Sequence, residues 1–186
     1  MADIRAASRY VKSLLGLAVE KNVLDKVHAD MQLFAQVVEE NRAFELLLLN
    51  PIIKHDKKRA ILEKIFAGKV NALTMAIFDI ITKKNREPLL PAIAKEFHKA
   101  YNTYKDIGPA SLTTAFPIDA KLRAEFEKIA TELSDMKNVE LKVEVDKDLI
   151  GGFVLEVGDK QIDASIKSKL KALKLNFSQN PYVKEY

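Results

Sequence analysis

The 186-residue sequence contains no cysteine and no tryptophan. The lack of cysteine excludes a disulfide framework, thiolate zinc sites, iron–sulfur clusters and cysteine nucleophiles. None of the apolar runs, such as the four leucines at 46–49, approaches the 18 or so residues that a membrane-spanning helix needs. The opening residues also lack the charged and then apolar layout of a signal peptide. We therefore expect a soluble protein that remains in the compartment where it is made.

Glycine is scarce in the first part of the chain. Only Gly16 and Gly68 fall within residues 1–107, where apolar residues recur at the three- and four-residue steps of amphipathic helices. We expect six helices: three over about 3–20, 23–41 and 43–49, a fourth between an Asp56 cap and Gly68, a fifth after an Asn71 cap, and a sixth from Pro88 to about 105. The short connections between them predict a compact six-helix bundle.

The sequence pattern changes at Gly108-Pro109. Strict alternation of apolar and charged residues at 139–145 predicts a half-buried strand. We expect further strands at 110–116 and 153–157, brief pairing at 161–162, and helices at about 122–133 and 163–175. The predicted fold class is mainly α, with an N-terminal six-helix bundle over 1–107 and a small α+β C-terminal domain over 108–175 that has a meander-like sheet. Residues 176–186 are predicted to form a flexible tail.

The formal net charge of +4 raises the question of nucleic-acid binding. Residues 1–107 contain 18 Lys and Arg against 13 Asp and Glu, whereas residues 108–186 contain 12 against 13. Such a modest and dispersed excess is typical of a solvated surface. No aromatic residues interleave with the lysine clusters, as a base-stacking surface would require. The lysine clusters are therefore interpreted as solvated surface. A basic nucleic-acid-binding protein is the alternative function.

Few residues suggest catalysis. His28, His55 and His98 lie in separate segments without a second histidine at ligand spacing, so each is interpreted as a solvated or capping residue. Gly151-Gly152 is not followed by the Lys-Ser or Lys-Thr of a phosphate-binding loop, and it predicts a tight bend. We expect no catalytic residue and no cofactor.

One stretch is rich in carboxylates, with Asp146, Asp148, Asp159 and Asp163. A metal site or an acid–base pair is one interpretation of these residues. Turn and cap chemistry is the simpler one, because aspartate favours turns and Asp163 or Ser165 can cap the last helix. No metal site is predicted.

Several motifs resemble one known family. They are Arg9-Tyr10-Val11-Lys12-Ser13-Leu14-Leu15, Asn50-Pro51-Ile52-Ile53 followed by Lys58 and Phe66, and a C-terminal signature that comprises Asp146, Leu149-Ile150-Gly151-Gly152, Gly158-Asp159, Asp163, Ser165, Leu170 and Leu173. Together they resemble the delta subunit of bacterial F-type ATP synthase, which is called OSCP in mitochondria, over residues 4 to about 175. The C-terminal signature is the specific part of this resemblance.

The resemblance implies a non-catalytic subunit of the peripheral stalk, or stator. In this family a six-helix domain binds the catalytic head and a small α/β domain contacts the b subunits of the stalk, so that the head resists rotor torque during proton-driven ATP synthesis. The expected partners are the N-terminal helix of a head α subunit and the b subunits, with one copy of the protein in the complex. The expected location is peripheral, at the cytoplasmic face of the bacterial inner membrane, with no direct membrane insertion and no nucleic acid.

The resemblance also implies a groove between the first and fifth helices that receives the α-subunit helix. The groove positions would be Tyr10 and Ser13 on the first helix and Ile77 and Ile80 on the fifth, each pair three residues apart and so on one face. A plain core position is the alternative for Ile77 and Ile80. Asp79 falls between the apolar residues of the fifth helix and departs from the family pattern.

Overall fold

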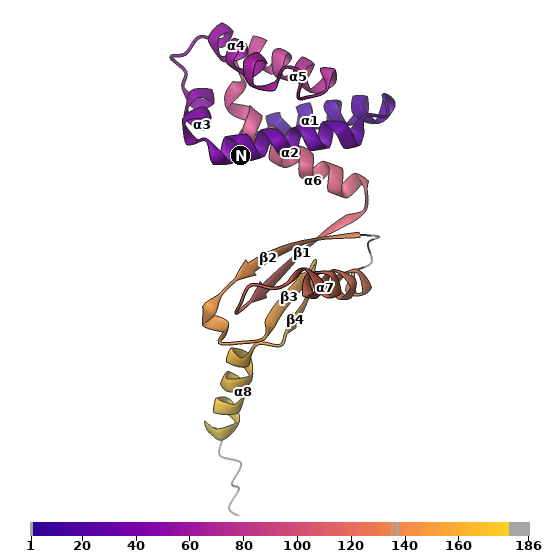
Figure 1. Cartoon of the computed structure of the whole chain (residues 1–186), viewed down its shortest axis with the longest axis vertical. Coiled ribbons are helices and arrows are strands. Elements are labelled where there is room, and N and C mark those ends of the chain that lie inside the picture. The colour runs from indigo at the N-terminus through magenta and orange to yellow at the C-terminus, as the bar shows by residue number, and fades with distance from the viewer. Residues whose placement is uncertain (1, 135, 137, 179–186) are drawn as a thin grey trace, which may run out of the picture. The chain divides into compact units, whose positions relative to one another are not determined.

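The computed structural model describes residues 2–134, 136 and 138–178, and it is mainly helical with one small four-stranded sheet. The chain divides into two compact units, Met1–Tyr104 and Lys105–Tyr186. Each unit has its own hydrophobic core. The predicted fold class is therefore confirmed in its main terms, a largely helical chain with a small sheet in its C-terminal part (Figure 1).

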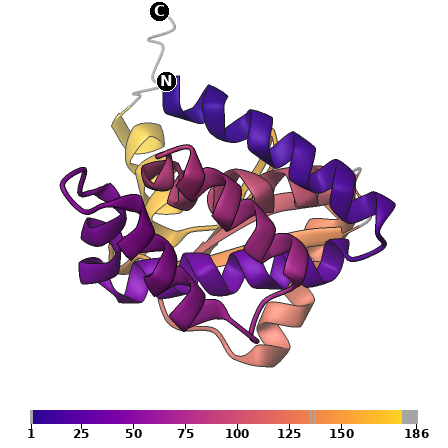
Figure 2. The same ribbon diagram turned by 90° about the horizontal axis from the view of Figure 1, so that it is seen from above.

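The first unit is made of helices. They are α1 (Ala2–Glu20), α2 (Leu24–Glu40), α3 (Arg42–Leu49), α4 (His55–Phe66), α5 (Ala72–Lys83), the 3-10 turn η1 (Glu87–Leu89) and α6 (Leu90–Tyr104). Helix α6 packs along α1 and α2, and α5 packs on α4. Seen from above in Figure 2, α5 runs beside α1, as it also does in Figure 1.

Phenylalanine rings form the centre of this core. The Phe34 ring lies 5.1 Å from that of Phe78 and 5.5 Å from that of Phe66, measured between centroids. Phe44 meets Phe34 edge to face at 6.1 Å. Aromatic pairs in this distance range add to the free energy of burial through their ring quadrupoles. The cluster thereby joins α2, α3, α4 and α5.

The helix ends of the first unit follow the expected signals with two exceptions. Asn71 caps α5, because its side chain accepts a hydrogen bond from the Leu73 amide at 3.0 Å. Asp56, however, is not a cap: α4 begins at His55, and Asp56 lies in its first turn, where a carboxylate still interacts well with the helix dipole. Pro88 falls in η1, so the following α-helix begins only at Leu90.

The second unit contains β1 (Ile107–Thr114), α7 (Ala120–Leu133), β2 (Asn138–Val145), the 3-10 turn η2 (Lys147–Leu149), β3 (Phe153–Val157), β4 (Lys160–Asp163) and α8 (Ile166–Ser178). The strand order is β2-β1-β3-β4. Alternate residues of the strands, among them Ala110, Leu112 and Leu155, are buried with Ala130 of α7, the helix that packs on β2 and β3.

The sheet is not a meander. Strand β1 pairs with β2 in parallel and with β3 in antiparallel orientation, so that Leu112 lies between Val143 and Leu155. A parallel pair needs a crossover, and α7 supplies it. Helix α8 also continues to Ser178, into the region predicted as tail. The rest of that predicted tail, 179–186, lies outside the described residues.

Candidate functional site

The four predicted groove residues lie on α1 and α5 with different exposure. The Tyr10 ring is half-buried and Ser13 is exposed, with its hydroxyl donating to the Arg9 carbonyl at 3.1 Å. Ile80, in the last turn but one of α5, is 48% exposed. Ile77 is only 8% exposed and belongs to the hydrophobic core. Tyr10, Ser13 and Ile80 are therefore accessible to a partner, whereas Ile77 packs α5 on the hydrophobic core.

The exposed side of α1 and α5 has more members than these four. Leu17 is exposed and lies seven residues after Tyr10, on the same face of α1. On α5, Ala76 is exposed next to Ile80. We call the surface made by Tyr10, Ser13, Leu17, Ala76 and Ile80 the α1–α5 face.

A hydrogen bond connects the two helices that form this face. The Arg86 guanidinium, directly after α5, donates to the Tyr10 hydroxyl at 3.3 Å. The turn η1 contacts both α1 and α5. The spacing of α1 and α5 is therefore fixed through the η1 segment, and Tyr10 has its apolar ring toward the protein and its hydroxyl at the surface.

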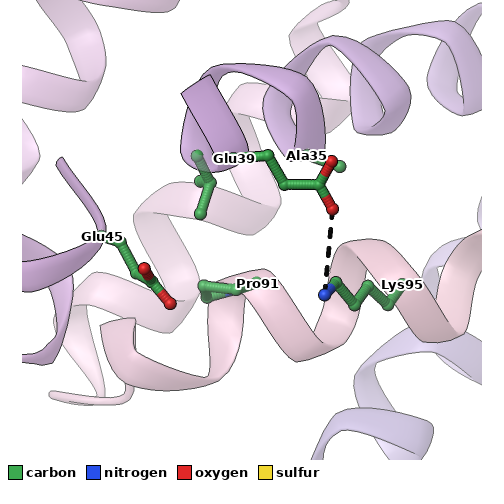
Figure 3. Close-up of a pocket in the computed structure, with 6 residues that line it drawn as sticks. Ala35, Glu39, Glu45, Pro91 and Lys95 are labelled. Atoms are coloured by element: carbon green, nitrogen blue, oxygen red, sulfur yellow. Dashed lines mark ion pairs between the residues drawn. The ribbon is translucent and has the colours of Figure 1, made fainter. Parts of the chain in front are cut away.

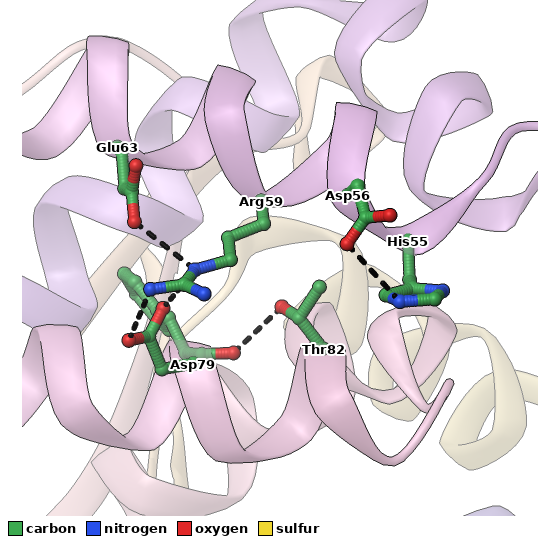
Figure 4. A network of polar contacts seen from close by, with 7 residues as sticks. His55, Asp56, Arg59, Glu63, Asp79 and Thr82 are labelled. Carbon is green, nitrogen blue, oxygen red and sulfur yellow. Dashed lines mark hydrogen bonds and ion pairs between the residues drawn. The ribbon is translucent and has the colours of Figure 1, made fainter.

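Asp79, the unexpected acid on α5, points away from the α1–α5 face. Arg59 of α4 binds both of its carboxylate oxygens, with Nε 3.0 Å from Oδ1 and Nη2 3.1 Å from Oδ2 (Figure 4). The same Nε also lies 3.0 Å from Glu63 Oε1. Such a two-pronged contact fixes orientation as well as distance. It holds α5 against α4.

The start of α5 is fastened to α2 by a second carboxylate. Asp30 accepts hydrogen bonds from the Asn71 amide at 2.7 Å and from the Thr74 hydroxyl at 2.6 Å. A carboxylate at this end satisfies an amide that has no partner within the helix. Helix α5 is thus held at its beginning by α2 and along its length by α4.

A buried lysine anchors the segment that precedes α4. Lys58 is 2% exposed; its ammonium donates to the Leu48 carbonyl at 2.9 Å and lies 3.7 Å from Glu87 Oε2. The interaction ties the end of α3 to α4 and η1. Lys58 belongs to a motif that carried the family resemblance, and the structure gives it this packing role.

In the second unit the signature residues gather where α8 begins. Asp146 caps η2 by accepting from the Asp148 amide at 2.9 Å. A Cβ on Gly151 would come within 2.6 Å of the Ile166 side chain, and one on Gly152 within 2.3 Å of the Ala164 carbonyl oxygen. The Ile166 amide donates to the Gly151 carbonyl at 3.0 Å. The two glycines therefore leave the space in which the entry to α8 packs.

Asp163 and Ser165 form the cap of α8. Ser165 is buried, and its hydroxyl accepts from the Ser168 amide at 3.2 Å. Asp163 accepts from the Ser168 hydroxyl at 2.5 Å and from the Ser165 amide at 2.8 Å. These hydrogen bonds, that of the Ser168 hydroxyl foremost, lower the pKa of the Asp163 carboxyl below its usual value. Gly158 and Asp159 form the turn between β3 and β4, apart from this cap.

Helix α8 carries an apolar stripe that the sequence reasoning did not single out as a surface. None of the residues Ile166–Ser178 is buried. Ile166, Leu170, Leu173 and Phe177 recur at four- and three-residue steps, so they share one face. Phe177 is 86% exposed. The helical spacing of these apolar residues is visible in the sequence, but the same spacing is equally typical of a helix face that packs on a hydrophobic core.

Two of the three histidines do come together, contrary to the sequence interpretation. His28 Nε2 of α2 and His98 Nδ1 of α6 are 2.9 Å apart, and the Tyr101 ring stacks on His28 at 3.7 Å between centroids. One ring donates to the other, so the pair joins α2 to α6. His55 is instead exposed beside Asp56, at 3.1 Å (Figure 4). No group of three or more metal-ligating side chains is found within the described part of the chain.

A small pocket lies between α2, α3 and α6. Figure 3 shows Glu39 and Glu45 at its rim, with Lys95 3.9 Å from Glu39 and Pro91 below. Its volume is about 70 Å³, well short of the several hundred Å³ typical of ligand sites. In the second unit a hollow of about 240 Å³ is lined by Pro109, Leu133 and other residues beside the β3–β4 turn. In this second hollow the Lys160 ammonium donates to the Leu133 carbonyl at 2.8 Å and the Ser134 hydroxyl accepts from the Met136 amide at 2.9 Å, so both groups are engaged by the backbone.

No helix among the described residues is both long enough and apolar enough to cross a membrane.

Comparison with known proteins gives a consistent result. The family model for the ATP synthase delta (OSCP) subunit matches residues 6–177. The ATP synthase subunit delta of Cytophaga hutchinsonii is 41% identical over 179 residues, which cover 96% of this chain and 97% of that protein. The chloroplastic ATP synthase delta chain of Chlamydomonas reinhardtii is 36% identical, covering 87% and 74% of the two chains.

The fold has a counterpart among solved structures. A chain of the Toxoplasma gondii mitochondrial ATP synthase hexamer matches with a TM-score of 0.70 at 20% identity, over 94% of this chain and 98% of that one. At this identity the match speaks for the fold. Together with the family model and the similar sequences, it shows that the chain belongs to the ATP synthase delta (OSCP) subunit family, whose members are structural and not catalytic.

Proposed function

We propose that this protein is the joint of the ATP synthase stator, with the first unit bound to the catalytic head and the second to the b-subunit stalk. Family membership supports the stator role, and the absence of an active-site motif in the sequence agrees with it. None of the similar proteins supports the alternative of nucleic-acid binding. The single observation that carries the division of labour is that each unit presents an exposed apolar helix face: the α1–α5 face in the first and the α8 stripe in the second.

The α1–α5 face suits an amphipathic helix as its occupant. Helix-in-groove recognition uses apolar anchors three and four residues apart, and Tyr10, Leu17 and Ile80 offer such contacts. The fastening of α5 by Asp30 and Arg59 keeps the face in one shape before binding, which lowers the entropic cost of association. The occupant under this proposal is the N-terminal helix of one head α subunit, with the six helices of the first unit acting as a single bundle.

The α8 stripe suits a helix of the stalk. Ile166, Leu170, Leu173 and Phe177 form a continuous apolar line on α8, a helix that contacts η2, has no buried residue and extends away from the sheet in Figure 1. Burial of this line against another helix would remove apolar side chains from water, which is the main driving force of association. The proposed occupant is the C-terminal part of the b subunits. One copy of the chain then joins one head to one stalk, at the cytoplasmic face of the membrane.

The direct test uses the lack of tryptophan. A peptide that copies about 25 N-terminal residues of the α subunit from the same organism and carries one tryptophan is titrated with the full chain, as a helix-in-groove partner. Saturable fluorescence change, unaffected by added RNA, is expected. No binding by correctly folded protein would remove the groove assignment.

Substitution of Tyr10 locates the site. Tyr10→Asp places a charge on an apolar contact surface, and we expect the peptide to bind at least ~2 kcal/mol more weakly. Leu33→Asp changes another exposed apolar residue, on α2 and away from the α1–α5 face, and serves as the control. Circular dichroism is expected to be unchanged for both variants. Equal affinity of folded Tyr10→Asp and wild-type protein would contradict the assignment.

A further inference from the structure

The α1–α5 face has positively charged residues along its edge. Lys83 and Lys84 lie three and four residues after Ile80, so both flank it at the end of α5. Arg86 follows and is hydrogen-bonded to Tyr10. Arg9 lies four residues before Ser13 on α1. All four cationic side chains are exposed, and we call them the basic rim.

The basic rim has no ion-pair partner within the part of the chain that the structure describes. Across the described residues, no ion pair links any of the four cations to a carboxylate. Asp79, the one acid within α5, is committed to Arg59 on the side that faces α4. Glu87, next to Arg86, is buried against Lys58. The two carboxylates nearest in sequence to Lys83 and Arg86 are therefore already paired with other cations, and the rim is left with a single sign of charge.

Unpaired cations beside an apolar stripe define the chemistry of the occupant. A helix that seats apolar side chains on Tyr10 and Ile80 brings its flanking residues within a few ångströms of the rim. Lysine or arginine at these flanking positions of the bound helix would be repelled by the rim. Glutamate or aspartate would form new ion pairs with it, and because these pairs stay partly hydrated the cost of desolvation is small. Charge complementarity of this kind selects partners and orients them more than it adds to affinity.

We infer that the α1–α5 face selects an amphipathic helix whose apolar stripe is flanked by acidic side chains, which pair with Arg9, Lys83, Lys84 and Arg86. This inference rests on the proposed function and specifies its partner: the α-subunit helix presents carboxylates on the edges of its apolar face. Lys83 and Lys84 are the principal determinants, because Arg86 is already engaged with Tyr10 and Arg9 lies on the opposite wall.

The experiment compares two peptides on the full-length protein. The first is the tryptophan-tagged N-terminal peptide of the α subunit, and the second has each Asp and Glu of that peptide replaced by Asn or Gln. We expect the acidic peptide to bind about fivefold more tightly at about 50 mM salt, with most of this advantage lost at about 300 mM. The amide peptide is expected to bind with nearly the same affinity at both salt concentrations.

Matched variants assign the effect to the rim. Lys83→Gln/Lys84→Gln is expected to weaken the acidic peptide about fivefold and to leave the amide peptide unchanged. Lys26→Gln/Lys64→Gln removes the same total charge from exposed positions on α2 and α4 and is expected to change neither affinity by as much as twofold.

The outcomes separate the two claims. If both peptides bind wild-type protein equally and without salt dependence, the face binds a helix but the acidic selection is wrong. If the two double variants weaken the acidic peptide to the same extent, net charge and not the rim is responsible, which also overturns the inference. If neither peptide binds folded protein, the proposed function itself fails.

Discussion

At the scale of single residues, Lys58 is a charged side chain whose burial depends on one carboxylate partner. Its ammonium is buried between the Leu48 carbonyl and Glu87, and Oε1 of Glu87 is the one buried side-chain oxygen without a partner among the described residues. The pair tolerates burial because each charge has the other nearby. Removing one partner leaves a buried charge uncompensated.

We therefore expect Lys58→Met to lower the free energy of unfolding by about 3 kcal/mol. The double variant Lys58→Met/Glu87→Gln should recover a large part of this loss, since no charge then remains buried. Urea unfolding followed by circular dichroism measures both. Lys57→Met, at the exposed neighbouring position, is the control, and a loss of the same size there would contradict the role of burial.

Gly152 and Gly158 illustrate two different reasons why a position requires glycine: a positive φ, and a lack of space for a Cβ. Both have positive φ, +78° and +58°, but a Cβ on Gly152 would also strike the Ala164 carbonyl oxygen whereas one on Gly158 meets open space. Gly158→Ala is expected to cost about 1 kcal/mol from backbone strain alone. Gly152→Ala should cost at least ~2 kcal/mol because the entry to α8 must move as well. Equal thermal shifts for the two variants would show that the close approach is unimportant.

Residue-level prediction from sequence succeeded for two of the three proposed helix caps and failed for Asp56, which lies in the first turn of α4. The Asn71 cap and the Ser165 cap depend on neighbours within three residues, and both are found. The contacts of Arg59 with Asp79 and of His28 with His98 join residues 20 and 70 positions apart. No periodicity encodes such pairs, so Asp79 seemed misplaced on the fifth helix until its partner was known.

At the scale of elements, the cap of α8 is expected to make the stability of the fold depend on pH in a specific way. The pKa of Asp163 is lower in the folded protein than in the unfolded chain, where an aspartate titrates near 3.9. The carboxylate therefore stabilises the fold fully above the unfolded value, and this contribution is lost as the pH falls through the lower folded value. The Asp163→Asn side chain has nearly the same shape as aspartate but carries no charge that changes with pH.

We expect the stability difference between wild-type protein and Asp163→Asn to be constant from pH 7 to about 5 and to shrink below about pH 4. Chemical unfolding at a series of pH values measures this difference. Asp159→Asn removes a carboxylate from the neighbouring turn and is the control for the change in net charge. A difference that stays constant down to acid pH would mean that the hydrogen bonds to Asp163 do not depend on its charge.

The positions of the elements were more predictable than their partners. Alternation of apolar and polar residues located β2 and β3 to within a residue, because it reports which residues face the core. It does not report the order of strands, so the parallel pairing of β1 with β2 was not foreseen. The groove residues were a similar case: spacing placed Ile77 and Ile80 on one face, and only packing showed that Ile80 is exposed and Ile77 buried.

At the scale of the whole molecule, two separate cores imply two separately folding units. The core of the first unit runs from Ala7 to Phe97, and that of the second from Ala110 to Val157, with no shared residue. We expect a fragment of residues 1–107 to be helical, to melt cooperatively and, under the proposed function, to bind the α-subunit peptide with the same affinity as the full chain. Circular dichroism and the fluorescence titration test this. A fragment without a cooperative transition would show that the helices need the rest of the chain.

The place of β1 in the sheet has a consequence for biosynthesis. This strand is the first of the second unit to leave the ribosome, yet its two neighbours, β2 and β3, begin only at Asn138 and Phe153. Until β2 emerges β1 has two open edges, and until β3 emerges it still has one; open edges are hazards for intermolecular pairing. The helical unit can meanwhile complete itself, since its last element ends at Tyr104. Vectorial synthesis thus lets the helical unit, the proposed head-binding half of the joint, fold before the sheet of the second unit can close.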